Sequence, residues 1–274
     1  MSEKVLTTPD VRFERDGDIA IMTITRPERG NAFTRAMSGT FCEMWTEVRE
    51  NRDIRVVIVT GEGERHFSTG ADVGGLSTDG DGLGLVSEPL DQMLFLTGQQ
   101  NKVWKPTICA VNGMAVGGGL HFVVDSDIVV ASANASFIDT HVNVGQVGAI
   151  ENIGLAKRLP IGTALRMTLQ GRSFRLSAER AYQLGLVDEL VDAPSDALPK
   201  ALEIAREIAR NSPNAMALSK ETIWKSFDMG YSSALEYGWA LVRMHWAHPD
   251  FAEGPAAFGE KRPPVWNPDP SARR

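Results

Sequence analysis

Short runs rich in β-branched residues alternate with longer amphipathic segments along this chain, and this alternation most constrains its fold. Short runs rich in β-branched residues predict strands, and apolar residues recurring every three to four positions predict helices. Strands that alternate with helices are typical of an α/β fold with parallel strands. We therefore predict strands over Ile19–Ile24, Val56–Thr60, Thr107–Val111 and Asp127–Ala131.

One amphipathic helix is predicted between the first two strands, with Thr34 as its N-cap. Its apolar residues share one helical face and read as core packing, not as a binding surface: Met37, Phe41, Met44, Trp45 and Val48. Beyond about Asp192 the pattern becomes helical, with segments predicted over 197–211, 213–227 and 232–245. The Pro-rich tail from Pro263 is expected to be extended or frayed.

Composition limits the classes of partner. The 274 residues can bury a full core, and 28 basic against 35 acidic residues give a formal charge of −7 with no basic cluster. We therefore expect neither nucleic acid nor a membrane as a partner. Cys42 and Cys109 have no CxxC or Cys/His ligand spacing, so we expect no disulfide and no structural zinc. With no signal-peptide pattern and no long apolar run, the sequence favours a cytoplasmic protein.

Glycine clusters are the first candidates for chemistry. Neither a GxGxxG after the first strand nor a GxxxxGK[ST] is present, which disfavours dinucleotide and P-loop sites. Gly117, Gly118 and Gly119 instead open a predicted helix, whose unpaired amides lie at the positive end of the helix dipole. Such an end can hold a negatively charged oxygen, although glycine triplets also serve the close packing of a helix on a sheet.

A second glycine turn, Ser68 to Asp72, follows the predicted strand Val56–Thr60. If the two turns end adjacent parallel strands, two backbone amides can point at one oxygen, as in an oxyanion hole. The Gly-, Ser- and Asp-rich stretch Gly74–Ser87 directly after it is predicted to be a surface loop and a candidate lid.

These turns belong to an ordered series of motifs that resembles the crotonase, or enoyl-CoA hydratase/isomerase, superfamily across nearly the whole chain. The series is RPERGNA (26–32), HFSTGAD (66–72), AVNGMAVGGG (110–119), SDIVVASANASF (126–137), LSAERAYQLGLVDELV (176–191) and FGEKRPPVW (258–266). The resemblance implies a crotonase-like β-β-α superhelix (the ClpP/crotonase fold) with a C-terminal helical region. It places the core in residues 1–195 and a helical trimerisation region in 196–274, and implies trimers or dimers of trimers.

The resemblance also implies an acyl-CoA substrate, with coenzyme A as part of the substrate and no separate cofactor. The amides of Ala71 and Gly118 match the pair that binds the thioester oxygen and stabilises an enolate. Arg29, Ala32, Gly70 and Asp72 match positions near the bound coenzyme. Phe258 and Lys261 match a Phe and a Lys that reach it from a neighbouring subunit, although they also read as a packing residue and a solvated charge.

The sequence departs from the family where a hydratase carries two glutamates, because His121 and His141 stand there. Imidazole can transfer protons near neutral pH. A helix N-terminus and a facing histidine would disfavour imidazolium, so we expect neutral rings. Asp139 and Glu151 are candidate carboxylates that could orient His141 and raise its basicity, or else solvated or capping residues. A metal site at the two histidines lacks a third ligand at helical spacing.

Three functions remain open at the level of sequence. The first is an acyl-CoA enzyme of the hydratase/isomerase type with His121 and His141 in place of the glutamates. The second is hydrolytic retro-Claisen cleavage of a β-dicarbonyl with His141 as base, since superfamily members that cleave β-diketones resemble this chain in having a His near that position. The third is a catalytically silent acyl-CoA-binding subunit.

Overall fold

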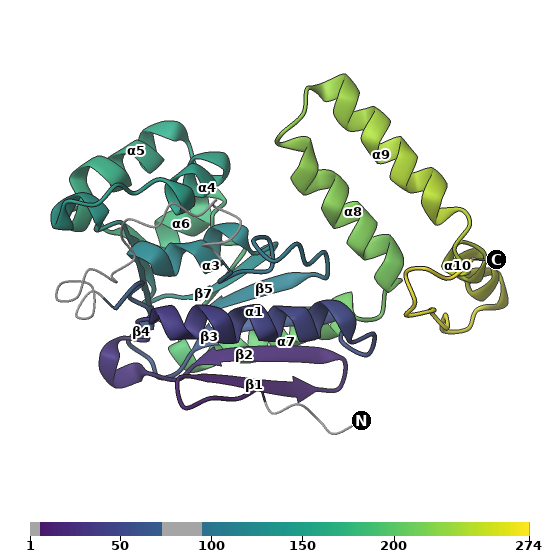
Figure 1. Ribbon diagram of the computed structural model, residues 1–274, viewed down its shortest axis with the longest axis horizontal. Coiled ribbons are helices and arrows are strands. Elements are labelled where there is room, and N and C mark those ends of the chain that lie inside the picture. Colours follow the sequence, from purple (N-terminus) through teal and green to yellow (C-terminus); the bar gives the residue numbers. More distant parts are fainter. Residues whose placement is uncertain (1–5, 73–94, 274) are drawn as a thin grey trace.

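Two β-sheets form the core of the protein (Figure 1). The computed structural model describes residues 6–72 and 95–273. The larger sheet has the strand order β1-β2-β3-β5-β7-β10, and the smaller one has the order β4-β6-β8-β9. In the larger sheet β1 pairs antiparallel with β2 and the other neighbours are parallel: Val11–Asp16 (β1), Ile19–Ile24 (β2), Val56–Gly61 (β3), Thr107–Val111 (β5), Ile128–Ser132 (β7) and Glu189–Val191 (β10).

The smaller sheet is built from four short strands, of which the first three each follow a strand of the larger sheet. Its members are His66–Ser68 (β4), Met114–Val116 (β6), Ser136–Ile138 (β8) and Leu176–Ser177 (β9). The successions β5-β6-α3 and β7-β8-α4 are the repeated β-β-α turns that the resemblance implies. The sequence did not show these short strands, because two or three residues are too few for a visible period.

Helices cover both faces of the larger sheet. Arg35–Glu50 (α1) is capped by the Thr34 hydroxyl and buries the five predicted apolar residues. Ala197–Ile208 (α7) packs on the opposite face, because it contacts Ile19, Ile21 and Ile58, whereas Ala20 and Met22 belong to the cluster under α1. Its alanines at every fourth position let this helix lie close on the sheet. The first helix beyond residue 195 therefore packs on the larger sheet.

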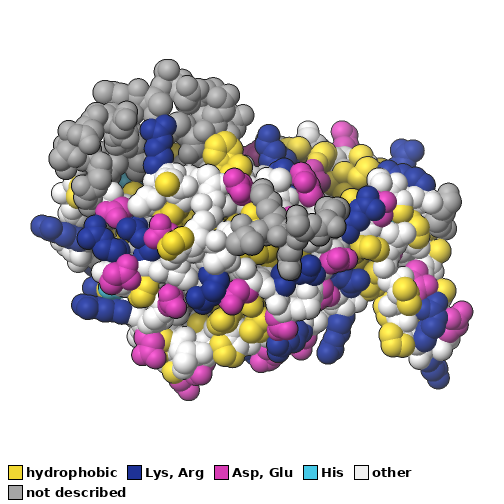
Figure 2. Space-filling model, turned by 60° about the horizontal axis from the view of Figure 1, so that its bottom comes forward, with side chains coloured by type: hydrophobic (Ala, Val, Ile, Leu, Met, Phe, Trp, Pro, Cys, Tyr) yellow, Lys and Arg dark blue, Asp and Glu magenta, His cyan; other side chains and the backbone are white. Residues whose placement is uncertain are grey.

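The remaining helices fall into two groups (Figure 1). Near the smaller sheet lie Leu120–Asp125 (α3), Ile150–Arg158 (α4), Ile161–Gln170 (α5) and Ala178–Leu184 (α6). At the other end stand Pro213–Ser226 (α8), Tyr231–His245 (α9) and Asp250–Glu260 (α10). No helix in the described ranges is long and apolar enough to cross a membrane. Figure 2 shows charges of both signs interleaved over the face drawn.

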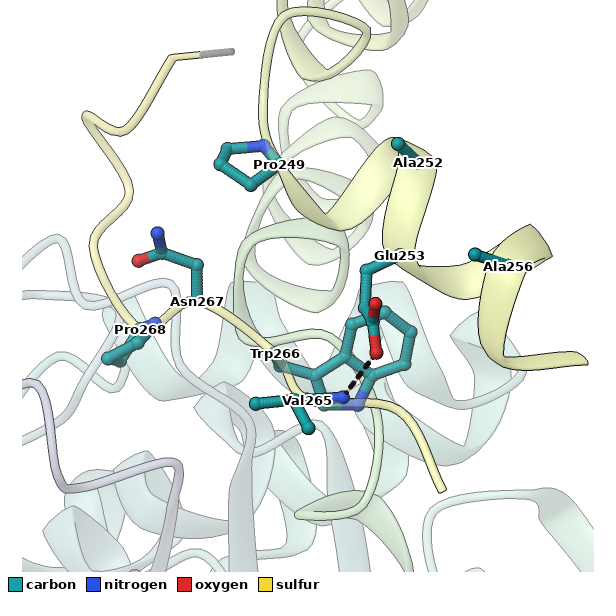
Figure 3. A pocket seen from close by; sticks show the side chains of 8 residues that line it. All are labelled: Pro249, Ala252, Glu253, Ala256, Val265, Trp266, Asn267 and Pro268. Carbon is teal, nitrogen blue, oxygen red and sulfur yellow. Dashed lines mark hydrogen bonds between the residues drawn. The ribbon is translucent and has the colours of Figure 1, made fainter. Parts of the chain in front are cut away.

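The tail after α10 is extended, as expected, but it is not frayed. Glu253 Oε1 accepts the Val265 amide at 2.6 Å (Figure 3), and Asp250 Oδ1 accepts the Asn267 amide at 2.8 Å. The Trp266 indole donates to the Arg210 carbonyl at 2.6 Å. Carboxylates of α10 thus accept backbone amides of the extended tail, as a neighbouring strand would, and hold the tail against the helix.

Candidate active site

The two glycine turns lie side by side at the ends of β4 and β6. Gly70 has a φ of +83°, and a methyl group there would stand 2.6 Å from the Gly118 nitrogen and 2.8 Å from the Val116 oxygen. Only glycine fits a backbone that is both left-handed and this close to its neighbour. The predicted adjacency is confirmed, but the strands that carry the turns are those of the smaller sheet.

The amides of Ala71 and Gly118 are close together. A Cβ built on Gly118 would lie 3.5 Å from the Ala71 nitrogen. The Phe33 amide donates to the Gly70 carbonyl, and the Phe33 carbonyl accepts the Asp72 amide. These two backbone hydrogen bonds lie on either side of Ala71 and do not use the Ala71 amide. Gly118 is the second residue of the 3-10 helix Gly117–Gly119 (η3), where helix amides lack an internal acceptor. Among the turn and loop contacts of the described residues, neither amide has an acceptor.

Asp139 holds His141 through one ring nitrogen. Asp139 follows β8, has no exposed surface, and its Oδ1 lies 2.7 Å from His141 Nδ1. The same oxygen accepts the His141 amide at 3.0 Å, and Asn152 Nδ2 donates to Oδ2 at 2.6 Å. Burial would raise the pKa of Asp139, but these hydrogen bonds outweigh it and lower the pKa. The predicted orienting carboxylate is therefore present, and it is buried instead of solvated.

The pKa of His141 is raised above its ordinary value. The hydrogen bond to Asp139 is the largest cause, burial opposes it, and the negative charge of Glu151 adds to it. A neutral ring was expected, whereas the two carboxylates beside His141 outweigh its burial and favour the charged form relative to a free imidazole. About a quarter of its side chain, 23 %, remains exposed, so the ring is accessible.

Glu151 lies between the two histidines. Its Oε1 is 3.0 Å from His141 Nε2, and its Oε2 is 3.4 Å from His121 Nε2. It sits in the first turn of α4, and its residue is only 3 % exposed. Oε1 is buried and has no well-aligned hydrogen bond within the described part of the chain, despite its short distance to His141. A buried acceptor without a partner marks a place where a further donor fits.

His121 is a buried residue of α3. Its Nδ1 lies 3.3 Å from Nε2 of Gln100. Sequence reasoning missed Gln100 and Asn152, because neither belongs to a recognisable motif. The cluster adjoins the glycine turns, since a Cβ on Gly117 would lie 3.3 Å from Thr140 Oγ1 and 3.8 Å from His141 Cε1. The four candidate acid/base residues are therefore brought together beside the two amides.

The residues predicted to bind coenzyme A form two separate groups. Arg29, Ala32, Gly70 and Asp72 lie together: the Asp72 carboxylate is 3.6 Å from the Arg29 guanidinium and 3.2 Å from that of Arg26. Arg26, which the sequence reading did not single out, also donates to the Ala32 carbonyl at 2.6 Å.

Phe258 and Lys261 lie elsewhere, on α10 and at its left-handed end. Phe258 is 88 % exposed, and α10 stands at the far end of the molecule from β4 (Figure 1). Within one chain these two residues do not meet the glycine turns.

Two further candidates from the sequence are a lid and a metal site. The candidate lid Gly74–Ser87 lies outside the described residues. Within residues 6–72 and 95–273, no group of three or more His, Cys, Asp or Glu side chains is arranged to hold a metal ion.

Known proteins are similar to this chain over nearly its whole length. The family model described as enoyl-CoA hydratase/isomerase matches residues 14–269. (E)-Benzylidenesuccinyl-CoA hydratase of Thauera aromatica is 32 % identical, covering 93 % of this chain and 98 % of that protein. Carnitinyl-CoA dehydratase of Salmonella typhi is 33 % identical, with coverages of 92 % and 96 %. A solved enoyl-CoA hydratase/isomerase from Mycobacterium paratuberculosis has a TM-score of 0.85 at 35 % identity, covering 95 % of this chain and 99 % of that one.

Proposed function

This chain belongs to the enoyl-CoA hydratase/isomerase family and has its crotonase fold, and from that premise we propose that it adds water to, or removes water from, an acyl-CoA thioester through an enolate. One observation carries the proposal: the Asp139-held imidazole of His141 lies 3.0 Å from Glu151 Oε1, and both groups lie beside the amides of Ala71 and Gly118, which have no turn or loop acceptor among the described residues. Two relatives similar over nearly the whole chain are named as a hydratase and a dehydratase of CoA thioesters.

The amides of Ala71 and Gly118 bind the thioester oxygen in this proposal. When the α-carbon gains or loses a proton, negative charge develops on that oxygen, and amide donors fixed in advance stabilise it. Both donors belong to the backbone and are placed by glycines, so their geometry depends on the close approach of Gly70 and Gly118. No side chain is required at this step.

Hydration needs a group that takes a proton from water and a group that gives a proton to the α-carbon. Glu151 Oε1, which has no aligned hydrogen bond among the described residues, takes the water proton as hydroxide adds to the β-carbon. His141 Nε2 is the donor, since Asp139 occupies Nδ1 and the raised pKa favours the charged ring. Dehydration runs through the same groups in reverse.

The coenzyme lies along Arg29, Ala32, Gly70 and Asp72 in this proposal, with no cofactor besides the CoA of the substrate. Phe258 and Lys261 then belong to the site of a neighbouring copy in a trimer or a dimer of trimers, because their own chain holds them far from the glycine turns. We take the protein to act in the cytoplasm, with no nucleic-acid or membrane partner.

A panel of 2-enoyl-CoA thioesters of different chain length and substitution tests the function. We expect loss of the conjugated-thioester absorbance and a product heavier by one water. His141→Gln should lower kcat by about 10²–10⁴-fold, the usual contribution of a positioned acid or base. Retention of full activity in this variant, or absence of turnover with every thioester while acyl-CoA still binds, would contradict the proposal.

Cleavage of a β-dicarbonyl is a second candidate, favoured by the 2.7 Å contact between Asp139 and His141. A carboxylate that holds one imidazole nitrogen leaves the other free to activate water, as in hydrolytic sites. Mass spectrometry separates the two reactions, since cleavage yields two shorter products and hydration yields one. A silent binding subunit would bind acyl-CoA but show neither product.

A further inference from the structure

Gln100 has a fixed orientation beside His121. Its side-chain oxygen accepts the backbone amides of Leu96 at 2.9 Å and Thr97 at 3.3 Å. Only the oxygen of an amide side chain can accept these hydrogen bonds, so the NH₂ group must point the other way. That NH₂ group lies 3.3 Å from His121 Nδ1 and 3.4 Å from Asp125 Oδ2.

This orientation determines which ring nitrogen of His121 carries the proton. A Gln NH₂ group can only donate, so the nitrogen that it faces must be the acceptor. The proton of the neutral ring is then on Nε2, the nitrogen 3.4 Å from Glu151 Oε2. Asp125 reinforces the orientation, because its Oδ2 also accepts the Thr97 hydroxyl at 2.6 Å and offers the NH₂ group a second acceptor.

We infer that Gln100 is a positioning residue that fixes His121 as the Nε2–H tautomer, so that His121 directs its proton at Glu151 Oε2 and leaves Oε1 for the reaction. His121 then exchanges no proton with substrate, although it stands at a family acid/base position. The order of groups from the loop to the site is Gln100, His121, Glu151, His141. This inference rests on the proposed function for its catalytic consequence, but the tautomer itself does not.

The unaltered protein tests the tautomer without any substrate. In protein labelled with ¹⁵N-histidine, long-range correlation spectra near neutral pH separate protonated from unprotonated ring nitrogens, and His121→Gln assigns the His121 signals. We expect an unprotonated Nδ1 and a protonated Nε2. A proton on Nδ1, alone or together with Nε2, overturns the inference whether or not the protein turns over acyl-CoA.

Gln100→Glu tests the catalytic consequence. A carboxylate can still accept the Leu96 and Thr97 amides, but it offers His121 Nδ1 an acceptor in place of a donor. We expect Nδ1 to become protonated and kcat to fall roughly 10- to 100-fold with little change in KM, the size of effect seen for partners behind a functional group. Gln99→Glu is the matched control, since it adds the same charge one residue away, and it should retain wild-type kcat.

His121→Gln and His121→Ala complete the test, because Gln keeps a donor that can reach Glu151 and Ala does not. We expect the Gln variant to retain more of the wild-type kcat than the Ala variant. Equal losses in both, or an unchanged kcat in Gln100→Glu, would overturn the positioning role while leaving the proposed function standing. Absence of wild-type turnover would instead overturn the proposed function.

Discussion

The acid/base residues show what a carboxylate does to a neighbouring imidazole. Asp139 is wholly buried, yet its hydrogen bonds from His141 and Asn152 stabilise the charged form enough to lower its pKa. The same contact raises the pKa of His141. The two shifts are the two sides of one interaction, which favours a charged imidazole next to Glu151.

Asp139→Asn should therefore change the pH profile as well as the rate. If His141 must be protonated to act, activity is lost as pH rises through its pKa. Removing the Asp139 charge lowers that pKa, so the alkaline limb of kcat should move to lower pH, with a loss of about 10²–10⁴-fold in kcat. A pH–rate series on both proteins measures this. An alkaline limb that stays in place would show that Asp139 does not act through His141.

The sequence revealed the individual residues of the site but not their contacts. His121 and His141 were identified from the motifs, and Asp139 from its place two residues before His141. Gln100 could not be found, because its role depends on a loop that brings residues 96 to 100 over α3. Asp139 and Glu151 were identified as carboxylates that could raise the basicity of His141, but the helix that brings Glu151 to 3.0 Å from the ring was not predicted.

At the scale of elements, the long apolar strands and helices could be predicted from the sequence, whereas the short strands could not. The long central strands and α1 follow from apolar runs and a helical stripe, and β5 has the predicted bounds. The two-residue strand β9 and the three-residue strands of the smaller sheet gave no period, although they carry both glycine turns. The elements that position the site are thus the ones with the weakest local signal, because they depend on neighbouring strands for their hydrogen bonds.

Gly70→Ala tests the close approach of the two turns. The change places a side chain in a left-handed conformation and puts a methyl group 2.6 Å from the Gly118 nitrogen. Gly17→Ala is the matched control, because Gly17 has a φ of +62° with nothing within 4 Å of the added methyl. Both variants should lose about 1–3 kcal/mol for the backbone conformation. Only Gly70→Ala should also lose turnover, since it forces the amides apart.

Urea unfolding and acyl-CoA turnover measure the two effects separately. Gly70→Ala should lose more unfolding free energy than Gly17→Ala, because the clash adds to the conformational cost. Equal losses of stability with unchanged turnover in both variants would show that the turns can separate without consequence, and the amides would then have no part in the reaction.

At the scale of the whole molecule, helices at both ends of the protein expose apolar side chains. The helix α9 exposes large apolar side chains, with Tyr231 81 %, Leu235 57 % and Trp239 55 % exposed. Exposed apolar residues also gather on α4 and α5, with Ile153 62 %, Ile161 62 % and Leu169 71 % exposed. Exposed apolar surface on this scale is typical of contacts between subunits. It fits an assembly in which α10 of one copy reaches the site of another.

Mixed oligomers test that arrangement through Lys261. His141→Gln and Lys261→Ala proteins should each be nearly inactive alone if each active site combines His141 of one chain with Lys261 of another. Unfolding and refolding the two together in equal amounts should restore about a quarter of wild-type turnover, since half of the sites keep the histidine and half of those meet an intact lysine. Lys200→Ala is the control, because that partly exposed lysine lies on α7 and pairs with Glu203 at 2.8 Å; it should be fully active alone. If Lys261→Ala is also fully active alone, or if mixing restores nothing, the lysine of a neighbouring chain has no part in the site.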